Sequence, residues 1–234
     1  MSRSNTWPTL SSDFTVARQR SRLPAQYYRD YDLLHGSKDY PTEVQSVIEF
    51  AASLGMSRPR SMVEIGCGTG NHTSEFLKRQ LTVTAIDIDP SILEIAKCKL
   101  ATHLGANLNL QLVSIQDVAM APADLAVSLF NVMNYVETQE ELEVFVSGVA
   151  RCLRPGGVFI FDCWNGEVVK LDPPKPETKS VSSKGSLTLT VDSRGTLADN
   201  SDSAIVKYSV RMRTSTQDQS YKYEIVSRLW TIDD

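Results

Sequence analysis

Three glycines at alternate positions stand where a short apolar run ends. Residues 61–70 read SMVEIGCGTG, and Asn71, which can cap a helix, follows Gly70. Glycine tolerates positive φ angles and leaves the backbone bare, and the first N–H groups of a helix have no partner within it. A strand, this turn and a helix therefore predict a place where a ligand touches the main chain. The signal is weak by itself, because any tight strand-to-helix connection favours glycine.

Acids near the ends of neighbouring predicted strands strengthen the prediction of a ligand site. Glu64 lies two residues before the first glycine, Asp87 ends a second strand, and Gln116-Asp117 follow a third. The carboxyl ends of parallel strands meet at one edge of the sheet, where open α/β sheets bind ligands. An acid after the second strand is typical of a ribose site, and Gln116-Asp117 can face an adenine edge. The pattern predicts a nucleoside-containing cofactor.

Two cofactors compete for this site. Dinucleotide sites favour the pattern GxGxxG, whereas the glycines here run GxGxG and position 71 is asparagine. Glu64 would also repel a diphosphate, but it suits the ammonium group of a methionine moiety. On charge, S-adenosylmethionine is the better match. An NAD-dependent oxidoreductase is the alternative, and it predicts nicotinamide binding.

Strand and helix patterns alternate through the middle of the chain. Strands are predicted at 62–65, 82–86, 108–113, 125–130 and 158–161, and helices at 41–54, 72–79, 90–104 and 139–153. Residues 108–113 alternate between apolar and polar, which indicates an edge strand, whereas 125–130 are almost wholly apolar and so central. The fold class predicted is α/β, a Rossmann-like, doubly wound and mostly parallel sheet.

The pattern of apolar and polar residues changes after Trp164. Residues 172–186 hold three prolines and several serines and lysines without a period, which predicts a loop or linker. Three alternating runs then predict an antiparallel meander: 187–191, 206–213 and 221–232. The last run shifts phase near Ile225-Val226, which indicates a bulge.

Taken together, these stretches resemble class I S-adenosylmethionine-dependent methyltransferases over roughly residues 25–165. The matching stretches are VEIGCGTG (63–70), AIDIDP (85–90), QD (116–117), LFNVMNY (129–135) and LRPGG (153–157). The resemblance implies that the glycines let the cofactor approach, that Glu64 binds its methionine end and that Asp87 holds the ribose hydroxyls. It also implies that Asp117 meets the adenine amine, with Ile88 on the ring. The cofactor-binding residues expected are Tyr40, Glu64, Gly66, Cys67, Gly68, Gly70, Asp87, Ile88, Gln116, Asp117 and Phe130.

Within this superfamily, the tyrosine-rich arm around 31–40 and residues 130–135 resemble small-molecule methyltransferases, including amino-sugar and glycine-type N-methyltransferases. In those enzymes tyrosines of the N-terminal arm fold over the methyl donor. His35 departs from them, since many relatives have tyrosine there. We expect Tyr31 and Tyr135 as catalytic residues that orient the acceptor, and a substrate-binding set of Asn131, Asn134 and Trp164.

The acceptor is the open part of this prediction. Methyl transfer is an in-line displacement at an activated sulfonium methyl, so positioning supplies most of the acceleration. A neutral amine needs only alignment, whereas an alcohol also needs a base. The sequence shows no obvious histidine on the acceptor side, which favours an amine nitrogen, with an O-methyltransferase of a small metabolite as the alternative.

Three parts of the chain are predicted. They are a flexible arm (1–24), an S-adenosylmethionine-binding domain with an N-terminal helical cap (25–165), and a linker with antiparallel strands (166–234). Related domains end with a further helix and two strands. Either the meander is an inserted lid or dimer surface on a shortened domain, or two of its strands are that end. The lack of a long helix after Trp164 favours the first. A shortened domain could also bind the cofactor without turnover.

The composition of the chain limits the kinds of partner that the protein can have. The net charge of −4 and the lack of a basic run disfavour nucleic acid, and no apolar stretch approaches the roughly 20 residues of a membrane span. The four cysteines lack CxxC spacing, which indicates reduced, buried thiols of a cytoplasmic protein. Three widely spaced histidines predict no metal site, and His72 is expected to be exposed. The partners expected are a small-molecule acceptor and a second copy, paired through exposed strand edges.

Overall fold

The computed structural model describes residues 23–183, 187–199 and 202–233. The predicted arm, 1–24, lies almost wholly outside these residues. The described chain divides into two compact units. The first unit contains residues 39–132 and 140–162, and the second contains 23–38, 133–139 and 163–233. Each unit is described by itself.

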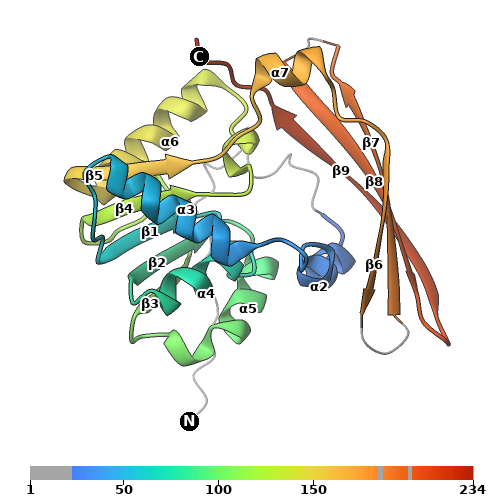
Figure 1. The fold of residues 1–234 in the computed structure, drawn as a ribbon, viewed down its shortest axis with the longest axis horizontal. Coiled ribbons are helices and arrows are strands. Elements are labelled where there is room, and N and C mark those ends of the chain that lie inside the picture. Colours follow the sequence, from blue (N-terminus) through green and yellow to red (C-terminus); the bar gives the residue numbers. More distant parts are fainter. Residues whose placement is uncertain (1–22, 184–186, 200–201, 234) are drawn as a thin grey trace. The chain divides into compact units, whose positions relative to one another are not determined.

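The first unit is built on a five-stranded parallel sheet with the order β3-β2-β1-β4-β5 (Figure 1). Its strands are β1 Ser61–Ile65, β2 Thr82–Asp87, β3 Leu108–Leu112, β4 Ala123–Ser128 and β5 Leu153–Phe161. The predicted Rossmann-like sheet is confirmed, with β3 at an edge and β4 between two strands. The predicted turn at 154–157 lies inside β5, where the pairing with β4 shifts between Ala123 and Leu125.

Two helices of the first unit begin at a side-chain cap, whereas the helix after the glycine turn begins after Gly70 without one, and Asn71, expected as a cap, is its first residue. The helices of this unit are α3 Tyr40–Ser53, α4 Asn71–Lys78, α5 Pro90–Lys99 and α6 Gln139–Cys152, with the short 3₁₀ turn η1 Ala101–His103. Of the 3₁₀ turn η2 Val132–Tyr135, only Val132 belongs to the first unit. The Asp39 carboxylate accepts the N–H of Thr42 at 3.1 Å, and Asp89 accepts that of Ser91 at 2.8 Å. Helices α3 and α4 pack together, α4 on β2 and α5 on β3 (Figure 1).

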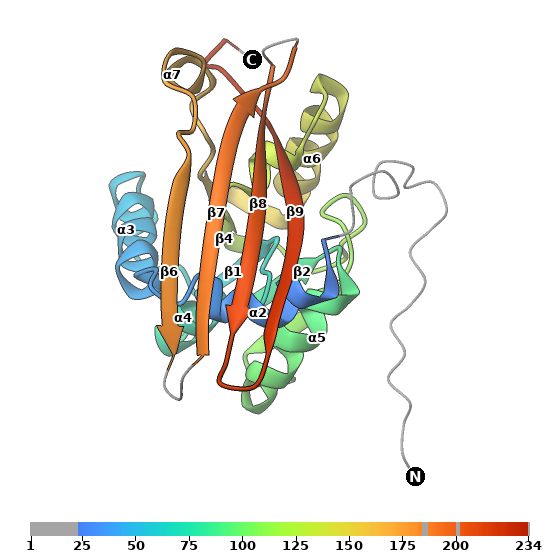
Figure 2. The same cartoon turned by 90° about the vertical axis from the view of Figure 1, so that its right-hand side faces the viewer.

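The second unit is a four-stranded antiparallel sheet, with the strands side by side in the order β6-β7-β8-β9 (Figure 2). Its elements are α2 Ala25–Leu34, α7 Gly166–Leu171, β6 Glu177–Ser183, β7 Leu187–Leu197, β8 Ser203–Arg213 and β9 Asp218–Arg228. Helix α2 groups with this sheet, and its tyrosines pack there. The rings of Tyr27 and Tyr223 lie 4.7 Å apart.

Two predictions for the C-terminal part are wrong. Residues 177–183 were expected in a loop, but they form β6 and pair with β7 along their whole length. Their Ser, Thr and Lys residues hide the strand period, since an edge strand can leave polar side chains in solvent. The bulge expected near Ile225-Val226 is absent from the unbroken register of β8 with β9. Ile225 keeps the inward phase of its strand, and Val226 is simply an exposed apolar residue.

Two predictions about single side chains are also wrong. His72 is buried, and its Nε2 lies 2.7 Å from the Glu43 carboxylate, because α4 packs directly against α3. Cys98 is exposed on α5, whereas Cys67 and Cys152 are buried as expected.

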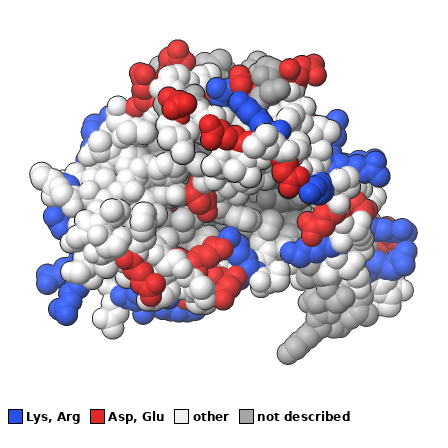
Figure 3. Space-filling model, turned by 45° about the horizontal axis from the view of Figure 1, so that its top comes forward, with Lys and Arg blue, Asp and Glu red and all other residues white. Residues whose placement is uncertain are grey.

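No helix in the described residues has the length and apolar character needed to cross a membrane. On the face that Figure 3 shows, Lys and Arg side chains lie among Asp and Glu, and neither sign covers a continuous area of the described residues.

Candidate functional site

The loop between β1 and α4 has the bare backbone that its glycines predict. Gly66, Gly68 and Gly70 have φ angles of 72°, 57° and 80°. The loop is tied to β2, because the N–H groups of Gly66 and Cys67 donate to the Ile86 carbonyl at 2.9 and 3.0 Å. A Cβ on Gly66 would lie 2.6 Å from a methyl carbon of Val132. Gly66 is therefore required both for its backbone angle and for the close approach of the segment after β4.

Glu64 is an acid in the centre of the sheet. It is 2% exposed, and the Thr73 hydroxyl donates to Oε2 at 2.6 Å. Burial raises the pKa of Glu64 to about 8, against the lowering effect of the Thr73 hydrogen bond and with a further increase from Asp87. The side chain is therefore mostly protonated at neutral pH. It would ionise when a cationic group arrives.

Asp87, at the end of β2, holds the glycine loop from the other side. Its carboxylate accepts the N–H of Gly68 at 2.9 Å and that of Asp89 at 3.0 Å. Burial raises its pKa, and these backbone hydrogen bonds oppose the increase. The predicted pair of acids thus lies on two neighbouring strands beside one bare turn.

The segment after β4 contains two residues in the left-handed region. Phe130 and Asn131 have φ angles of 66° and 62°, which is uncommon for residues other than glycine. Their N–H groups donate to the two carboxylate oxygens of Asp162, at 2.9 and 2.5 Å. Asp162 follows β5 and was not among the residues predicted to bind the cofactor. It fixes a turn that carries two predicted site residues.

Ser114 is a second residue that sequence reasoning missed. It follows β3, is 8% exposed, and its hydroxyl has no hydrogen-bond partner among the described residues. Buried polar groups are normally satisfied, so this hydroxyl is available to a ligand. The predicted adenine residues lie close by, because the N–H of Asp117 donates to the Ser114 carbonyl at 3.0 Å. Asp117 itself is exposed and Gln116 is partly buried. No charge in the sequence marked Ser114.

Of the predicted catalytic pair, Tyr31 belongs to an aromatic cluster of the second unit, and Tyr135 lies in the same unit. The Tyr31 ring lies 5.7 Å from that of Tyr27 and 4.6 Å from that of His35. Burial raises the pKa of Tyr27 well above its ordinary value, and Tyr31, Tyr135 and Tyr223 raise it further. A phenol whose pKa is raised stays protonated at neutral pH, so Tyr27 is a neutral hydrogen-bonding group.

Asn134 and Trp164 are joined in the second unit. The Asn134 side-chain oxygen accepts the Trp164 N–H at 2.9 Å, and its amide nitrogen donates to the Arg228 carbonyl at 2.6 Å. Both ends of the amide are therefore used by the chain's own backbone, which favours a positioning role for Asn134. Trp164 lines a hollow with Tyr208.

The structure sorts the predicted residues by unit. All predicted cofactor residues lie in the first unit, where the ring of Tyr40, at the start of α3, lies 4.8 Å from that of His72. Asn131 is also in the first unit, whereas Tyr31, Tyr135, Asn134 and Trp164 are in the second. The bare turn, the protonated acid and the available Ser114 hydroxyl fit a cofactor with an ammonium group and a polar ring system. S-adenosylmethionine has both.

Comparison with known proteins places the same region in a family. Residues 62–157 match the family of methyltransferase domains. The chain is 28% identical over 140 residues to a dTDP-3-amino-3,4,6-trideoxy-alpha-D-glucopyranose N,N-dimethyltransferase of Streptomyces venezuelae, covering 57% of this chain and 55% of that protein. It is 24% identical over 226 residues to a dTDP-4-amino-2,3,4,6-tetradeoxy-D-glucose N,N-dimethyltransferase of Saccharopolyspora spinosa, covering 94% and 86%. This chain thus spans about half the length of the first relative.

Solved structures share the fold. DesVI from Streptomyces venezuelae superposes with a TM-score of 0.78 at 19% identity, covering 91% of this chain and 87% of that one. The S-adenosylmethionine-bound amino pentose methyltransferase CalS10 from Micromonospora echinaspora gives a TM-score of 0.72 at 18% identity, covering 91% and 86%. The match over 62–157 and the fold agree with the acids and the bare turn. Residues 62–157 therefore match a methyltransferase domain, and the chain shares the fold of solved methyltransferases.

Proposed function

We propose that this protein transfers a methyl group from S-adenosylmethionine to the amine nitrogen of a small molecule, with amino sugars as the acceptor class. One observation carries the proposal. Both relatives described above are named as amino-sugar N,N-dimethyltransferases, and the match to the second extends over 94% of this chain, including its C-terminal strands.

The first unit supplies the proposed cofactor contacts. The cofactor brings an activated methyl group on its sulfonium centre. Glu64 would ionise to hold the ammonium of the methionine moiety, while the backbone at Gly66 and Gly68 faces the cofactor. Asp87 would hold the ribose hydroxyls, and Ser114 or Asp117 the adenine edge. Each role uses a group whose burial or hydrogen bonding in this chain suits it.

The second unit supplies the proposed acceptor contacts. Tyr31, in the aromatic cluster, and Tyr135 would orient the acceptor. His35 lies against Tyr31, and burial lowers its pKa to about 4, with Lys179 and Lys38 adding to the effect. A neutral imidazole beside Tyr31 supplies no strong base, and an amine nitrogen in its neutral form needs alignment more than a base.

A product screen tests the proposal. The protein is incubated with S-adenosylmethionine and matched amine and hydroxyl forms of small sugars and nucleotide-linked sugars, and products are identified by mass. The expected result is addition of one or two methyl groups to amine compounds only. Methylation of hydroxyl compounds alone would assign the protein to O-methyl transfer. Cofactor binding without any product would support a binding protein without turnover.

Variants of the two tyrosines test the orienting role. Tyr31→Phe and Tyr135→Phe keep the ring but lose the hydroxyl. We expect each to lower kcat by about tenfold, since one orienting hydrogen bond is lost, and to leave cofactor affinity unchanged. Unchanged kcat in both variants would show that the two hydroxyls do not orient the acceptor and that the rings only pack. A homodimer through the edge strands β6 and β9 stays a prediction, to be checked by light scattering after size-exclusion chromatography.

A further inference from the structure

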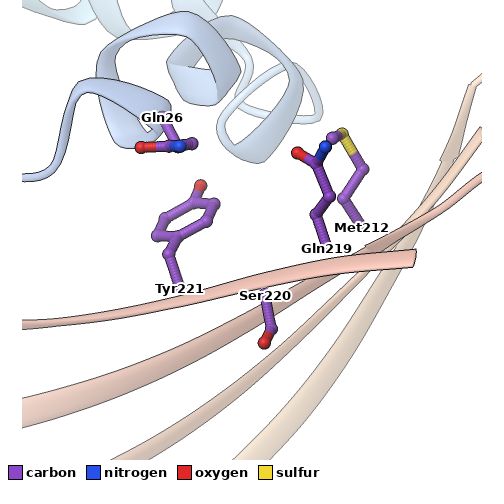
Figure 4. Close-up of a pocket in the computed structure, with 5 residues that line it drawn as sticks. All are labelled: Gln26, Met212, Gln219, Ser220 and Tyr221. Carbon is purple, nitrogen blue, oxygen red and sulfur yellow. The ribbon is translucent and has the colours of Figure 1, made fainter. Parts of the chain in front are cut away.

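One face of the second unit's sheet is covered by α2. In Figure 4, Tyr221 and Gln219 rise from β9 toward α2, whereas Ser220 points to the opposite side. The Tyr221 hydroxyl donates to the Asp30 carboxylate of α2 at 3.0 Å. Tyr223 shares the face of Tyr221, because side chains alternate along a strand, and it contacts Tyr27 of α2.

A row of residues crosses the sheet on this same face. Glu177 of β6 pairs with Ser193 of β7, Ser193 with Tyr208 of β8, and Tyr208 with Tyr223 of β9. Residues directly opposite each other on antiparallel strands share a face. A carboxylate, a hydroxyl and two phenol rings therefore form one line from the β6 edge to the aromatic cluster.

The row borders a hollow of about 480 Å³, which we call the Trp164 hollow. It is lined by Trp164, Pro174, Lys175, Pro176, Glu177, Ser193, Val206 and Tyr208. This volume lies within the range of small-molecule sites, and apolar walls with a few polar groups are typical of them.

The walls of the Trp164 hollow are held by contacts within the second unit. Asn134 accepts the backbone N–H of Trp164, and Tyr208 stacks on Tyr223 with ring centroids 4.7 Å apart and planes 11° apart. Pro174 sits against Gly195, where an added Cβ would lie 2.5 Å from the proline Cβ. The aromatic walls are thus fixed by packing and hydrogen bonding.

The lining of the Trp164 hollow carries one carboxylate, Glu177, and one ammonium, Lys175. The Lys175 ammonium pairs with Asp172, 3.0 Å away. In the described part of the chain, the structure records no cation paired with Glu177. Burial raises the pKa of Tyr208, and the charge of Glu177 raises it further, so the field of this carboxylate reaches the phenol. A carboxylate beside aromatic rings is the combination that attracts an organic cation.

We propose that the Trp164 hollow binds the amine-bearing ring of the acceptor, with its ammonium toward Glu177 and its apolar face on Trp164 and Tyr208. The nitrogen gives up a proton, to the Glu177 carboxylate or to water, before the neutral amine takes the methyl group. Glu177 is then a specificity-determining residue that selects amine acceptors over hydroxyl acceptors. The inference rests on the proposed function for the class of acceptor, but binding here needs neither cofactor nor turnover.

Fluorescence titration with a matched pair of sugars tests this site directly. D-Glucosamine and D-glucose differ by an amine in place of a hydroxyl, and Trp164 is a reporter inside the hollow. We expect saturable quenching by glucosamine in the intact protein and its loss in Trp164→Phe, where the indole is removed. Glu177→Gln should weaken glucosamine binding about fivefold, since an exposed ion pair contributes modestly. The same change should leave the response to glucose unaltered.

Glu224→Gln is the matched control. Glu224 lies opposite Lys207 on the other face of β8 and β9, so its loss should not change glucosamine binding. Equal glucosamine binding in Glu177→Gln and the unaltered protein would overturn the assignment, as would absence of any Trp164-dependent signal. If glucosamine binding depends on Glu177 but no amine is methylated, the proposed function is wrong and the assignment of the Trp164 hollow as an amine site still holds. If amines are methylated and Glu177→Gln does not change their methylation, the proposed function holds and the Trp164 hollow is not the acceptor site.

Discussion

Glu64 is the residue whose chemistry depends most on its surroundings. Its carboxyl is almost fully buried between β strands, and the Thr73 hydroxyl is the side-chain donor recorded for it. The desolvation of a carboxylate outweighs that hydrogen bond, so the folded pKa of about 8 exceeds the ordinary value of 4.5. A bound ammonium would reverse the balance. In its proposed role, Glu64 would couple cofactor binding to the loss of a proton.

This coupling predicts proton release on binding. Isothermal titration with S-adenosylmethionine at pH 7, in buffers of different ionisation enthalpy, should show close to one proton released per cofactor. Affinity should increase as the pH rises toward about 8, the folded pKa of Glu64, and then level off. In Glu64→Gln the release should vanish and binding should weaken. Glu49→Gln, on the exposed side of α3, is the control. Proton-independent binding in the unaltered protein would contradict the prediction.

At the scale of elements, two turns are fitted to one another in the first unit. The glycine turn follows β1, and the 130–132 turn follows β4, which pairs with β1. Val132 lies against Gly66 with no room for a Cβ, and Asp162 holds Phe130 and Asn131 in the left-handed region. The shape of the site is therefore set by pairs of loops rather than by single motifs.

Gly105 offers a matched comparison for Gly66. The two glycines have φ angles of 75° and 72°, but a Cβ at Gly105 would meet nothing within 4 Å. Gly105→Ala should lower the free energy of unfolding by about 1 kcal/mol, from backbone strain alone. Gly66→Ala adds a steric overlap and should lower it by about 3 kcal/mol, with loss of cofactor binding. Urea denaturation measures both, and adding Val132→Ala should recover only the steric part. Equal losses in the two variants would show that Val132 does not constrain Gly66.

Asp162→Asn tests the second turn. An amide presents one acceptor oxygen, so one of the two backbone N–H groups loses its partner. Loss of a hydrogen bond to a charged group should lower the free energy of unfolding by about 2 kcal/mol in urea denaturation. Asp172→Asn, on an exposed loop, should stay within about 0.5 kcal/mol. A stability of Asp162→Asn equal to that of the control would mean that the turn holds without the carboxylate.

At the scale of the whole molecule, the two units carry buried groups with opposite pH responses. Glu64 in the first unit has a raised folded pKa, so its burial destabilises the folded state increasingly as pH rises from about 4.5 to about 8. His35 in the second unit faces Lys179, Lys38 and Asp32, and its folded pKa of about 4 lies below the ordinary 6.5. Its contribution is fully present above 6.5 and is lost as pH falls toward 4.

Thermal unfolding without cofactor, between pH 4.5 and 8.5, should therefore show nearly constant stability up to about pH 6.5, where the two effects oppose each other, and a loss of stability from there to about pH 8. In His35→Phe the Glu64 effect stands alone, so stability should fall steadily from about pH 4.5. In Glu64→Gln the His35 effect stands alone, so stability should fall as pH decreases below about 6.5 and stay constant above it. The Asp124 carboxylate does not blur this window, since its hydrogen bond with Arg154 lowers its pKa to about 2. A pH profile of His35→Phe identical to that of the unaltered protein would contradict the role of His35.

The sequence by itself determined the parts of this protein that follow from local pattern. The order of strands and helices, the edge place of β3 and the interior place of β4 follow from hydrophobic period and length. The bare turn and the acids Glu64 and Asp87 follow from residue type at the ends of strands. Charge alone then distinguished the cofactor from a dinucleotide.

Only the tertiary structure decided what depends on contacts between distant residues. β6 needed β7 beside it, because its own polar residues show no period. Helix α2 joined the C-terminal sheet through rings far apart in the chain, such as Tyr27 and Tyr223. Three further features arise from burial, which no single segment of sequence specifies. They are the hydrogen bond between Asp162 and Phe130, the available hydroxyl of Ser114 and the protonation of Glu64.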